Sequence, residues 1–368
     1  MHEVVTPPDL QMRDRALTPV WEKVRRRERI SQTDGLACLQ TTDLIALGRM
    51  ADWSARRRSG DHVFFTLNVH INPTNICVLS CSFCDFAARR GDAHAYEHST
   101  EDILAQIPHD VHEVHIVGGH HPSWSFEHFE ELLRTIKRER PNVQIKAFTA
   151  AEIDYFHKRW KLDDEEIFDR LIEAGLNSMP GGGAEVFSER VRRELFPGKA
   201  GADRWIEIHQ TAHGMGIKSN ATMLYGHIET YAERVGHLDR LRQAQDETGG
   251  FLCFIPLEYQ LGTTNLVPRQ ASPMEDLRTL ATARLMLDNF PHIKAYWVMS
   301  GEETASIGVN FGADDLDGTI QHERIAHAAL AASPLGLTRD RMVRLIKDAG
   351  KIPVERNALY EPIHVYAN

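Results

Sequence analysis

Three closely spaced cysteines are the residues of this sequence that point most directly to chemistry. Cys77, Cys81 and Cys84 have the spacing Cys-x3-Cys-x2-Cys. Thiolates bind iron–sulfur clusters, and a cubane has four irons. Three ligands on one loop leave one iron free to bind something else, and a catalytic metal centre needs such an open position. The spacing therefore predicts a catalytic 4Fe–4S cluster.

A structural zinc site in a protein without enzymatic activity is the alternative interpretation. Zinc normally completes a tetrahedron with a fourth ligand, which His70 or His115 could supply. The remaining cysteines, Cys38 and Cys253, stand in helix-like and strand-like apolar contexts, so we expect buried thiols there rather than ligands. An odd number of cysteines with a cluster of three does not suit a disulfide framework. It indicates a reducing compartment, and we expect the cytoplasm.

Composition is that of an ordinary soluble globular protein. Hydrophobic residues make up 42% of the chain and charged residues 26%, and the formal net charge is −10. This balance does not suggest a nucleic-acid or membrane-surface partner. We also find no apolar stretch of about 18 residues, which a membrane helix would need.

The elements that must position the cysteines follow a regular alternation of short apolar runs and amphipathic stretches. This pattern predicts an α/β fold, a (β/α)8 TIM-like barrel of parallel strands. An open doubly wound sheet is the alternative, but no Gly-x-Gly-x-x-Gly follows the first strand. The expected strands are residues 64–71, 111–117, 143–148, 176–179, 217–224, 251–257, 293–299 and 307–311.

Helical extensions are expected on both sides of the barrel. Residues 1–60 have helical periodicity, and further helices are expected near 320–331 and 338–349. We therefore divide the chain into an N-terminal helical extension (1–60), a barrel (61–318) and a C-terminal helical extension packed on the barrel (319–368).

The cysteine loop follows the first expected strand, at the end of a parallel barrel where active sites lie. With the aromatic Phe83 before the last cysteine, it resembles the signature loop of the radical S-adenosylmethionine (SAM) superfamily. This resemblance implies that the open iron binds SAM and that one electron then releases a 5′-deoxyadenosyl radical. It also implies that the backbone of Gly118 and Gly119 contacts the methionine part of SAM.

Further stretches resemble one family within it, the aminofutalosine synthases of the futalosine route to menaquinone. They are residues 72–75, 117–122, 146–153, 179–185, 220–230, 294–297 and 310–319. The resemblance implies a transferase that adds the 5′-deoxyadenosyl group of SAM to 3-[(1-carboxyvinyl)oxy]benzoate. Rearrangement and loss of a carboxylate then give 6-amino-6-deoxyfutalosine. Residues 258–262 depart from the family pattern, in a loop that we expect to shape the substrate pocket.

Candidate site residues come from these stretches and from the ends of the expected strands. For the cofactors they are the three cysteines as metal ligands, with Phe83, Gly118, Gly119 and Glu152 for SAM. For the substrate they are Asn72, Lys146, Thr149, Asn220, Tyr225, Tyr296 and Asp314. His70 and His227 are the candidates for a catalytic role.

The nearest rival function is cyclic dehypoxanthine futalosine synthase, a radical enzyme of the same pathway that shares the cluster loop. The 220–224 stretch and residues 254–257 favour the aminofutalosine interpretation. The resemblance implies reduced flavodoxin or ferredoxin as electron donor. The sequence does not fix the oligomeric state; a homodimer is the assembly we consider.

Overall fold

The centre of the molecule is a curled sheet of seven parallel strands. The computed structural model describes residues 5–367, and its sheet has the order β2-β3-β4-β5-β6-β7-β8. The strands are β2 (Asn68–Ile71), β3 (Glu113–Ile116), β4 (Gln144–Ala147), β5 (Leu176–Met179), β6 (Lys218–Tyr225), β7 (Phe251–Glu258) and β8 (His292–Ile293).

Two further strands close the ring. β1 (His62–Thr66) runs directly into β2, and β9 (Asp315–Gly318) lies beside β1 in parallel. On its other side β9 meets the chain just after β8, where Lys294 bridges to Asp315. The predicted barrel is therefore confirmed, with β9 as its last strand.

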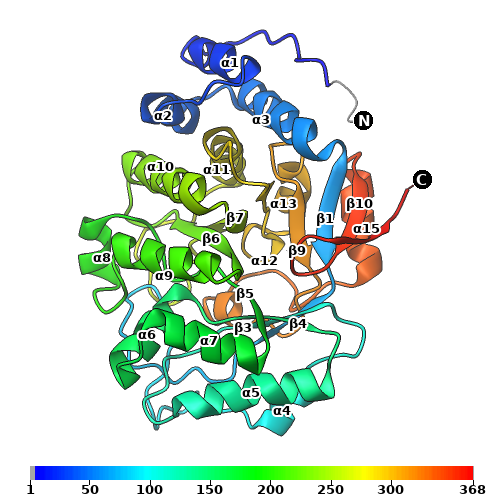
Figure 1. Ribbon diagram of the computed structural model, residues 1–368. Coiled ribbons are helices and arrows are strands. Elements are labelled where there is room, and N and C mark those ends of the chain that lie inside the picture. Colours follow the sequence, from blue (N-terminus) through cyan, green and yellow to red (C-terminus); the bar gives the residue numbers. More distant parts are fainter. Residues whose placement is uncertain (1–4, 368) are drawn as a thin grey trace.

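Helices cover the outside of the barrel, as Figure 1 shows. They are α4 (Thr100–Ala105), α5 (Phe126–Glu139), α6 (Ala150–Trp160), α7 (Asp164–Ala174), α8 (Glu189–Leu195), α9 (Ala202–Gly214), α10 (Tyr231–Thr248), α11 (Pro273–Met286), α12 (Trp297–Ser300) and α13 (Glu302–Gly308). Their limits follow local signals. In α7, for example, the Asp163 carboxylate accepts from the amide of Glu166, and Gly175 ends the helix with a φ of 114°.

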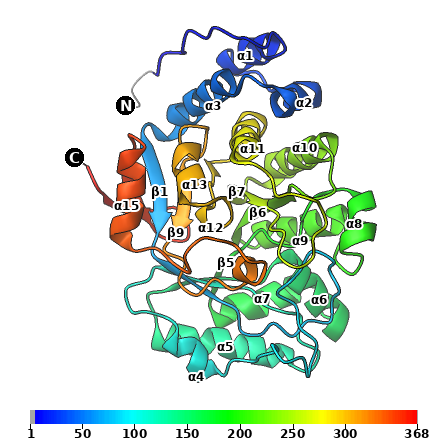
Figure 2. The same cartoon turned by 180° about the vertical axis from the view of Figure 1, so that it is seen from behind.

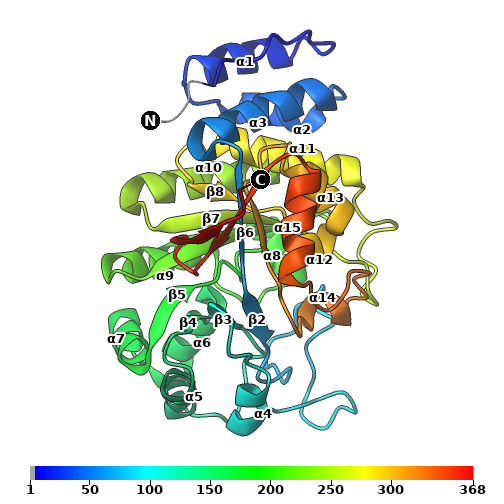
Figure 3. The same ribbon diagram turned by 90° about the vertical axis from the view of Figure 1, so that its right-hand side faces the viewer.

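The two ends of the chain pack on the barrel. Helices α1 (Leu17–Arg25), α2 (Gln32–Gln40) and α3 (Leu44–Ser59) form a layer over α10 and α11 (Figures 1 and 3). At the other end, α14 (Ile325–Ala328) is a single turn, and α15 (Arg339–Asp348) packs against α13 and the strand that follows it, at the edge of the molecule shown in Figure 2. The C-terminal segment is not only helical, because β10 (Ile352–Arg356) pairs with β1 and β11 (Pro362–Val365) pairs with β10.

Two predicted strands near the end of the barrel are wrong. The expected strand at 293–299 ends at Ile293, and Trp297 begins the short helix α12. The expected strand at 307–311 is the end of α13 and the turn after it. The apolar spacing there is that of a helix packed on α11.

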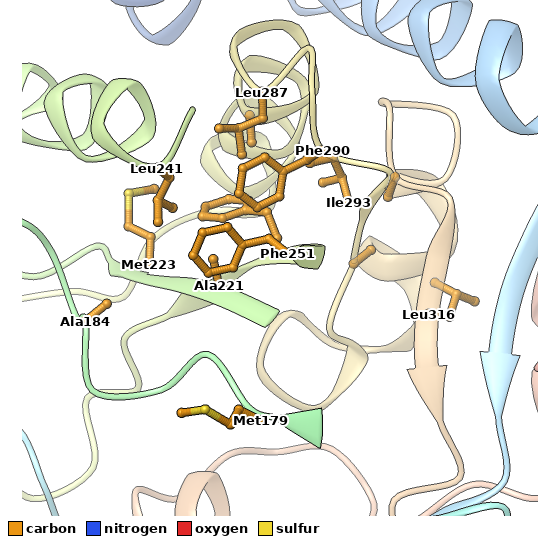
Figure 4. Close-up of a cluster of buried hydrophobic side chains, with 14 of the residues drawn as sticks. Met179, Ala184, Ala221, Met223, Leu241, Phe251, Leu287, Phe290, Ile293 and Leu316 are labelled. Atoms are coloured by element: carbon orange, nitrogen blue, oxygen red, sulfur yellow. The ribbon is translucent and has the colours of Figure 1, made fainter. Parts of the chain in front are cut away.

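An apolar core fills the space between the sheet and the helices. Figure 4 shows part of it, where Phe251 of β7 stacks on Phe290 at a centroid distance of 5.4 Å and an interplanar angle of 12°. Met223, Leu241 and Leu287 lie around this pair and are essentially inaccessible to solvent. Within residues 5–367, no helix combines the length and the apolar composition that crossing a membrane requires.

Candidate active site

A cavity of about 290 Å³ lies where the carboxyl ends of the barrel strands meet. Its wall includes all three cysteines of the cluster loop. Gly118 after β3, Glu152 after β4 and the glycines at 181–183 after β5 also line it. The cavity therefore occupies the position at which parallel barrels bind their substrates.

Backbone hydrogen bonds hold the cluster loop in place. The amide of Cys77 donates to the carbonyl of Ala88 (3.0 Å), and the amide of Val78 donates to the carbonyl of His120 (3.0 Å). Asn75 fixes a distant part of the same loop: its Nδ2 donates to the His94 carbonyl, and its Oδ1 accepts from the amide of Tyr96, both at 2.9 Å. The cysteines are thus placed by the backbone on both sides of them.

The surroundings of the thiols suit a cluster. Burial raises the pKa of Cys81 to about 11, while the charge of Lys199 opposes that shift. The Lys199 ammonium is bonded to the Glu185 carboxylate and lies 5.2 Å from the centre of the Phe83 ring. A cation beside the thiols compensates the negative charge of thiolate ligands.

The spacing of the thiols also matters for the kind of metal centre. Within residues 5–367, no three His, Cys, Asp or Glu side chains are grouped so as to hold a single metal ion. A cubane presents a different iron to each thiolate, so its ligands need not converge on one point. The three cysteines on one cavity wall, with Lys199 behind them, fit such a cluster.

Gly118 and Gly119 are needed because backbone passes close to them. The Gly119 amide donates to the Thr74 carbonyl (2.8 Å), and a Cβ at Gly119 would lie 2.3 Å from the carbonyl oxygen of Ile76. The residue next to Ile76 is Cys77, so this glycine lets the β3 loop pack directly against the cluster loop.

Glu152 has two functions in the geometry of the cavity. Its Oε2 accepts from the backbone amide (2.7 Å) and the hydroxyl (2.9 Å) of Thr149, which form a capping box at the start of α6. Its Oε1 lies 3.4 Å from the Gly118 amide. Burial raises the pKa of Glu152 to about 7. Glu152, Thr149 and Gly118 all line the cavity.

Deeper in the barrel, polar side chains from three adjacent strands form its floor. His70 of β2, His115 of β3 and Lys146 of β4 are register partners. His115 Nδ1 and His70 Nε2 are 3.2 Å apart, and the Lys146 ammonium donates to Glu113 at 2.6 Å. Asn220 and Tyr296 also line the cavity.

Four sequence candidates are not brought into the cavity, because each is already bonded elsewhere. The Asn72 amide donates to the Val117 carbonyl (2.8 Å), and the Tyr225 hydroxyl donates to Asp276 (2.7 Å). His227 is turned back by Gly226, whose φ is 87°, and pairs with Glu229 at 3.0 Å.

Asp314 is the fourth. Its carboxylate forms a buried ion pair with Arg284 (2.6 Å) and meets His292 (3.0 Å). It therefore faces the helices outside the barrel rather than the cavity.

The remaining expectations concern thiols and a loop. Cys38 and Cys253 are buried free thiols, as expected, and burial raises the pKa of each to about 12. In the departing stretch 258–262, Tyr259 and Gln260 line the cavity, so this loop does shape the site.

Sequence reasoning missed several cavity residues. Lys199 lies in an irregular segment after α8, where no periodicity or motif marks it. His115 was considered only as a zinc ligand, although its place opposite His70 follows once the parallel register is known. Asp317 and Glu323 follow from the true position of the last strand, β9.

Known proteins resemble this chain over most of its length. Residues 71–241 match the Radical SAM superfamily model, and residues 248–368 match the CofH/MqnC C-terminal region. An aminodeoxyfutalosine synthase of Thermus thermophilus is 45% identical over 364 residues, covering 96% of this chain and 98% of that protein. A cyclic dehypoxanthine futalosine synthase of Streptomyces coelicolor is 36% identical over 359 residues, covering 95% and 90%.

A solved structure supports the fold. The crystal structure of methylornithine synthase matches with a TM-score of 0.74, covering 91% of this chain and 97% of that chain. Its sequence identity is 19%, so this likeness concerns the fold alone.

Proposed function

Since the chain belongs to the aminodeoxyfutalosine synthases of the radical SAM superfamily, we propose that it adds the 5′-deoxyadenosyl group of SAM to 3-[(1-carboxyvinyl)oxy]benzoate. The observation that carries this proposal is the 45% identity to the Thermus thermophilus synthase over 96% of the chain. The cyclic dehypoxanthine futalosine synthase is more distant, at 36%. The chain is therefore a transferase that forms a carbon–carbon bond and consumes SAM.

The overall reaction joins the adenosyl 5′ carbon to the vinyl carbon of the benzoate. A reduced cluster, when bound, supplies one electron that cleaves SAM into methionine and the 5′-deoxyadenosyl radical. After addition the substrate radical attacks the ring, and the ether carbon–oxygen bond breaks as the new carbon–carbon bond forms. The carboxylate then leaves as CO2 together with the unpaired electron, which the oxidised cluster would take back, and addition of water to CO2 gives bicarbonate. The product is 6-amino-6-deoxyfutalosine, an intermediate of menaquinone biosynthesis.

The residues of the cavity divide this work between them. Cys77, Cys81 and Cys84 hold the cluster, and all three line one cavity with Gly118. The backbone at Gly118 and Gly119 contacts the methionine part, and Glu152 accepts hydrogen bonds from ribose hydroxyls. Lys146 and Asn220 face the substrate from the strands below.

Exclusion of water is the other requirement. A primary carbon radical is quenched by any hydrogen donor that reaches it before the vinyl carbon does. Apolar side chains line much of the cavity wall, among them Leu79, Phe86, Ile255, Leu257 and Met299. They keep the reacting carbons in contact and limit the access of solvent.

We also propose the physiological setting. Reduced flavodoxin or ferredoxin is the electron donor, the protein works in the cytoplasm, and it forms a homodimer. The donor must approach the cluster loop, and Val78 in that loop is exposed to solvent.

Product analysis tests the function. The cluster is reconstituted anaerobically, and the enzyme is given dithionite, SAM and the enol-ether benzoate. Mass spectrometry should find a product that retains the adenosyl group, and Cys81→Ala should abolish it. Formation of free 5′-deoxyadenosine and methionine, with the benzoate unchanged, would refute the proposed substrate. Dehypoxanthine futalosine is then the next substrate to offer.

A further inference from the structure

The row of His70, His115 and Lys146 contains hydrogen-bond donors that no group within residues 5–367 uses. The His115 Nε2 is buried and has no hydrogen-bond partner among the described residues. The Lys146 ammonium has three hydrogens, and its one hydrogen bond within residues 5–367 is to Glu113. All three side chains of the row line the cavity.

The charges around the row are already paired. Glu113 is bonded to Lys146 (2.6 Å), and Asp317 is bonded to Lys294 (3.0 Å). Glu323, the other carboxylate near His70, pairs with His327 at 2.9 Å. Burial and the neighbouring His70 and Lys146 lower the pKa of His115 well below its ordinary value, so both imidazoles are neutral donors and acceptors.

The two histidines fix each other's tautomer. Their contact joins His115 Nδ1 to His70 Nε2 at 3.2 Å, so one nitrogen must donate and the other accept. When His115 donates from Nε2 to a ligand, its Nδ1 is the acceptor and His70 must donate. His70 therefore acts as a positioning residue for His115.

The depth of the row decides which part of the substrate it meets. Each member lies within its strand, whereas Gly118, Gly119 and Glu152 follow the ends of β3 and β4. The adenosyl group and the vinyl carbon must meet at the level of those loops. The group at the far end of the substrate is the ring carboxylate, which is unchanged in the reaction.

We propose that His115, held by His70 and assisted by Lys146, binds the ring carboxylate of the benzoate at the floor of the cavity. This inference rests on the proposed function and adds the residues that select a benzoate over an aryl ether whose ring has no carboxylate. A carboxylate there accepts from the free His115 Nε2–H and from a free Lys146 N–H. Binding energy at this unreactive end then positions the vinyl carbon for attack.

A binding experiment without reductant tests the proposal, because SAM is not cleaved under those conditions. The cluster-loaded protein with SAM is titrated with the benzoate and with 2-phenoxyacrylate, which lacks the ring carboxylate. His115→Phe should weaken benzoate binding by about 10- to 100-fold and leave 2-phenoxyacrylate binding within about twofold. His115→Gln, which keeps a donor near the Nε2 position, should restore most of the affinity.

Two further variants test whether His70 positions His115. His70→Phe should weaken benzoate binding about 3- to 10-fold through loss of the fixed tautomer, and His70→Gln should restore it. His209→Gln is the matched control. His209 of α9 is also buried, with an Nε2 that has no partner within residues 5–367, but its Nδ1 meets Ser219 of β6 and the residue does not line the cavity. This variant should change neither affinity.

The outcomes separate the two proposals. The carboxylate assignment would be overturned if His115→Phe weakened the binding of the benzoate and of 2-phenoxyacrylate equally. It would also be overturned if this variant weakened SAM binding in place of benzoate binding. Unchanged benzoate affinity in His115→Phe would do the same. If the wild-type protein binds no benzoate and forms no adenosyl adduct, the proposed function itself is wrong.

Discussion

Replacement of Gly119 by alanine should displace the cluster loop without touching a cysteine. The new Cβ would lie 2.3 Å from the Ile76 carbonyl oxygen and 2.7 Å from its carbonyl carbon. Non-bonded carbon contacts are roughly 3.5 Å, so the two backbones must separate by about 1 Å. Both neighbours are main-chain atoms, which cannot rotate away.

The cost can be estimated from the contacts that hold the loop. Overpacking of this kind costs about 1–3 kcal/mol, and the displaced backbone would strain the hydrogen bond that the Gly119 amide donates to the Thr74 carbonyl. With an unfolding entropy of about 2.1 cal/mol/K per residue, 1 kcal/mol lowers Tm by roughly 1.3 °C in a chain of 368 residues. The expected loss of about 1–4 °C in Tm is small.

The effect on the cluster should be larger than the effect on stability. Metal–ligand distances tolerate about 0.2 Å, and the required separation at Ile76, the residue before Cys77, is several times that. Iron and sulfide content after anaerobic reconstitution should therefore fall by at least half in Gly119→Ala. Gly236→Ala is the control, since nothing lies within 4 Å of its added Cβ on α10. A Gly119→Ala protein with full iron content would refute this account of the loop.

The remaining predictions concern a buried ion pair, a buried carboxyl group and two buried thiols. Arg284→Met leaves the Asp314 carboxylate buried without its guanidinium partner, so the free energy of unfolding should fall by about 3–5 kcal/mol and Tm should fall with it. Adding Asp314→Asn should recover part of this stability, and an unaffected Tm would contradict the pairing. Burial and Asp276 raise the pKa of Glu258 from 4.5 in the unfolded chain to about 8 in the folded chain. The contribution of this group to the free energy of unfolding is therefore complete below about pH 4.5 and is lost as the pH rises from there to about 8. Glu258→Gln should therefore gain stability over the wild type by about 1 kcal/mol per pH unit between pH 5 and 8 in thermal melts, whereas a pH-independent difference would contradict the raised pKa. Cys38→Ala and Cys253→Ala should cost about 1 kcal/mol each and keep full iron content, whereas loss of iron would give these thiols a role at the cluster.

Most strands and helices of the barrel could be predicted from the sequence, because the apolar runs and helix caps there agree with the tertiary structure. The sequence was misleading at the last strand, whose residues are Asp-Leu-Asp-Gly and have low strand propensity. That strand forms because its carboxylates have buried partners: Asp315 pairs with Arg356 (2.6 Å) and Asp317 with Lys294 (3.0 Å). These partners are distant in sequence, so no local pattern reveals them.

The site could be predicted where a motif and a strand end coincide. The cysteines, Gly118, Gly119 and Glu152 all line the cavity for that reason. His227 also follows a strand, but the positive φ of Gly226 turns it back toward Glu229. Lys199 reaches the cavity from an irregular segment, and only the folded chain brings it to Glu185.

The pairing of β1 with β10 makes the order of synthesis relevant to the cluster. β1 leads through β2 into the cysteine loop, and its β10 neighbour begins at Ile352, whereas β1 begins at His62. At roughly 5–20 residues per second, the ribosome needs about 15–60 s between them. During that time one edge of β1 has no strand to pair with, and open edges invite association with other chains. The strand that leads into the β2–cluster loop segment therefore gains its β10 neighbour only after the ribosome has passed Ile352.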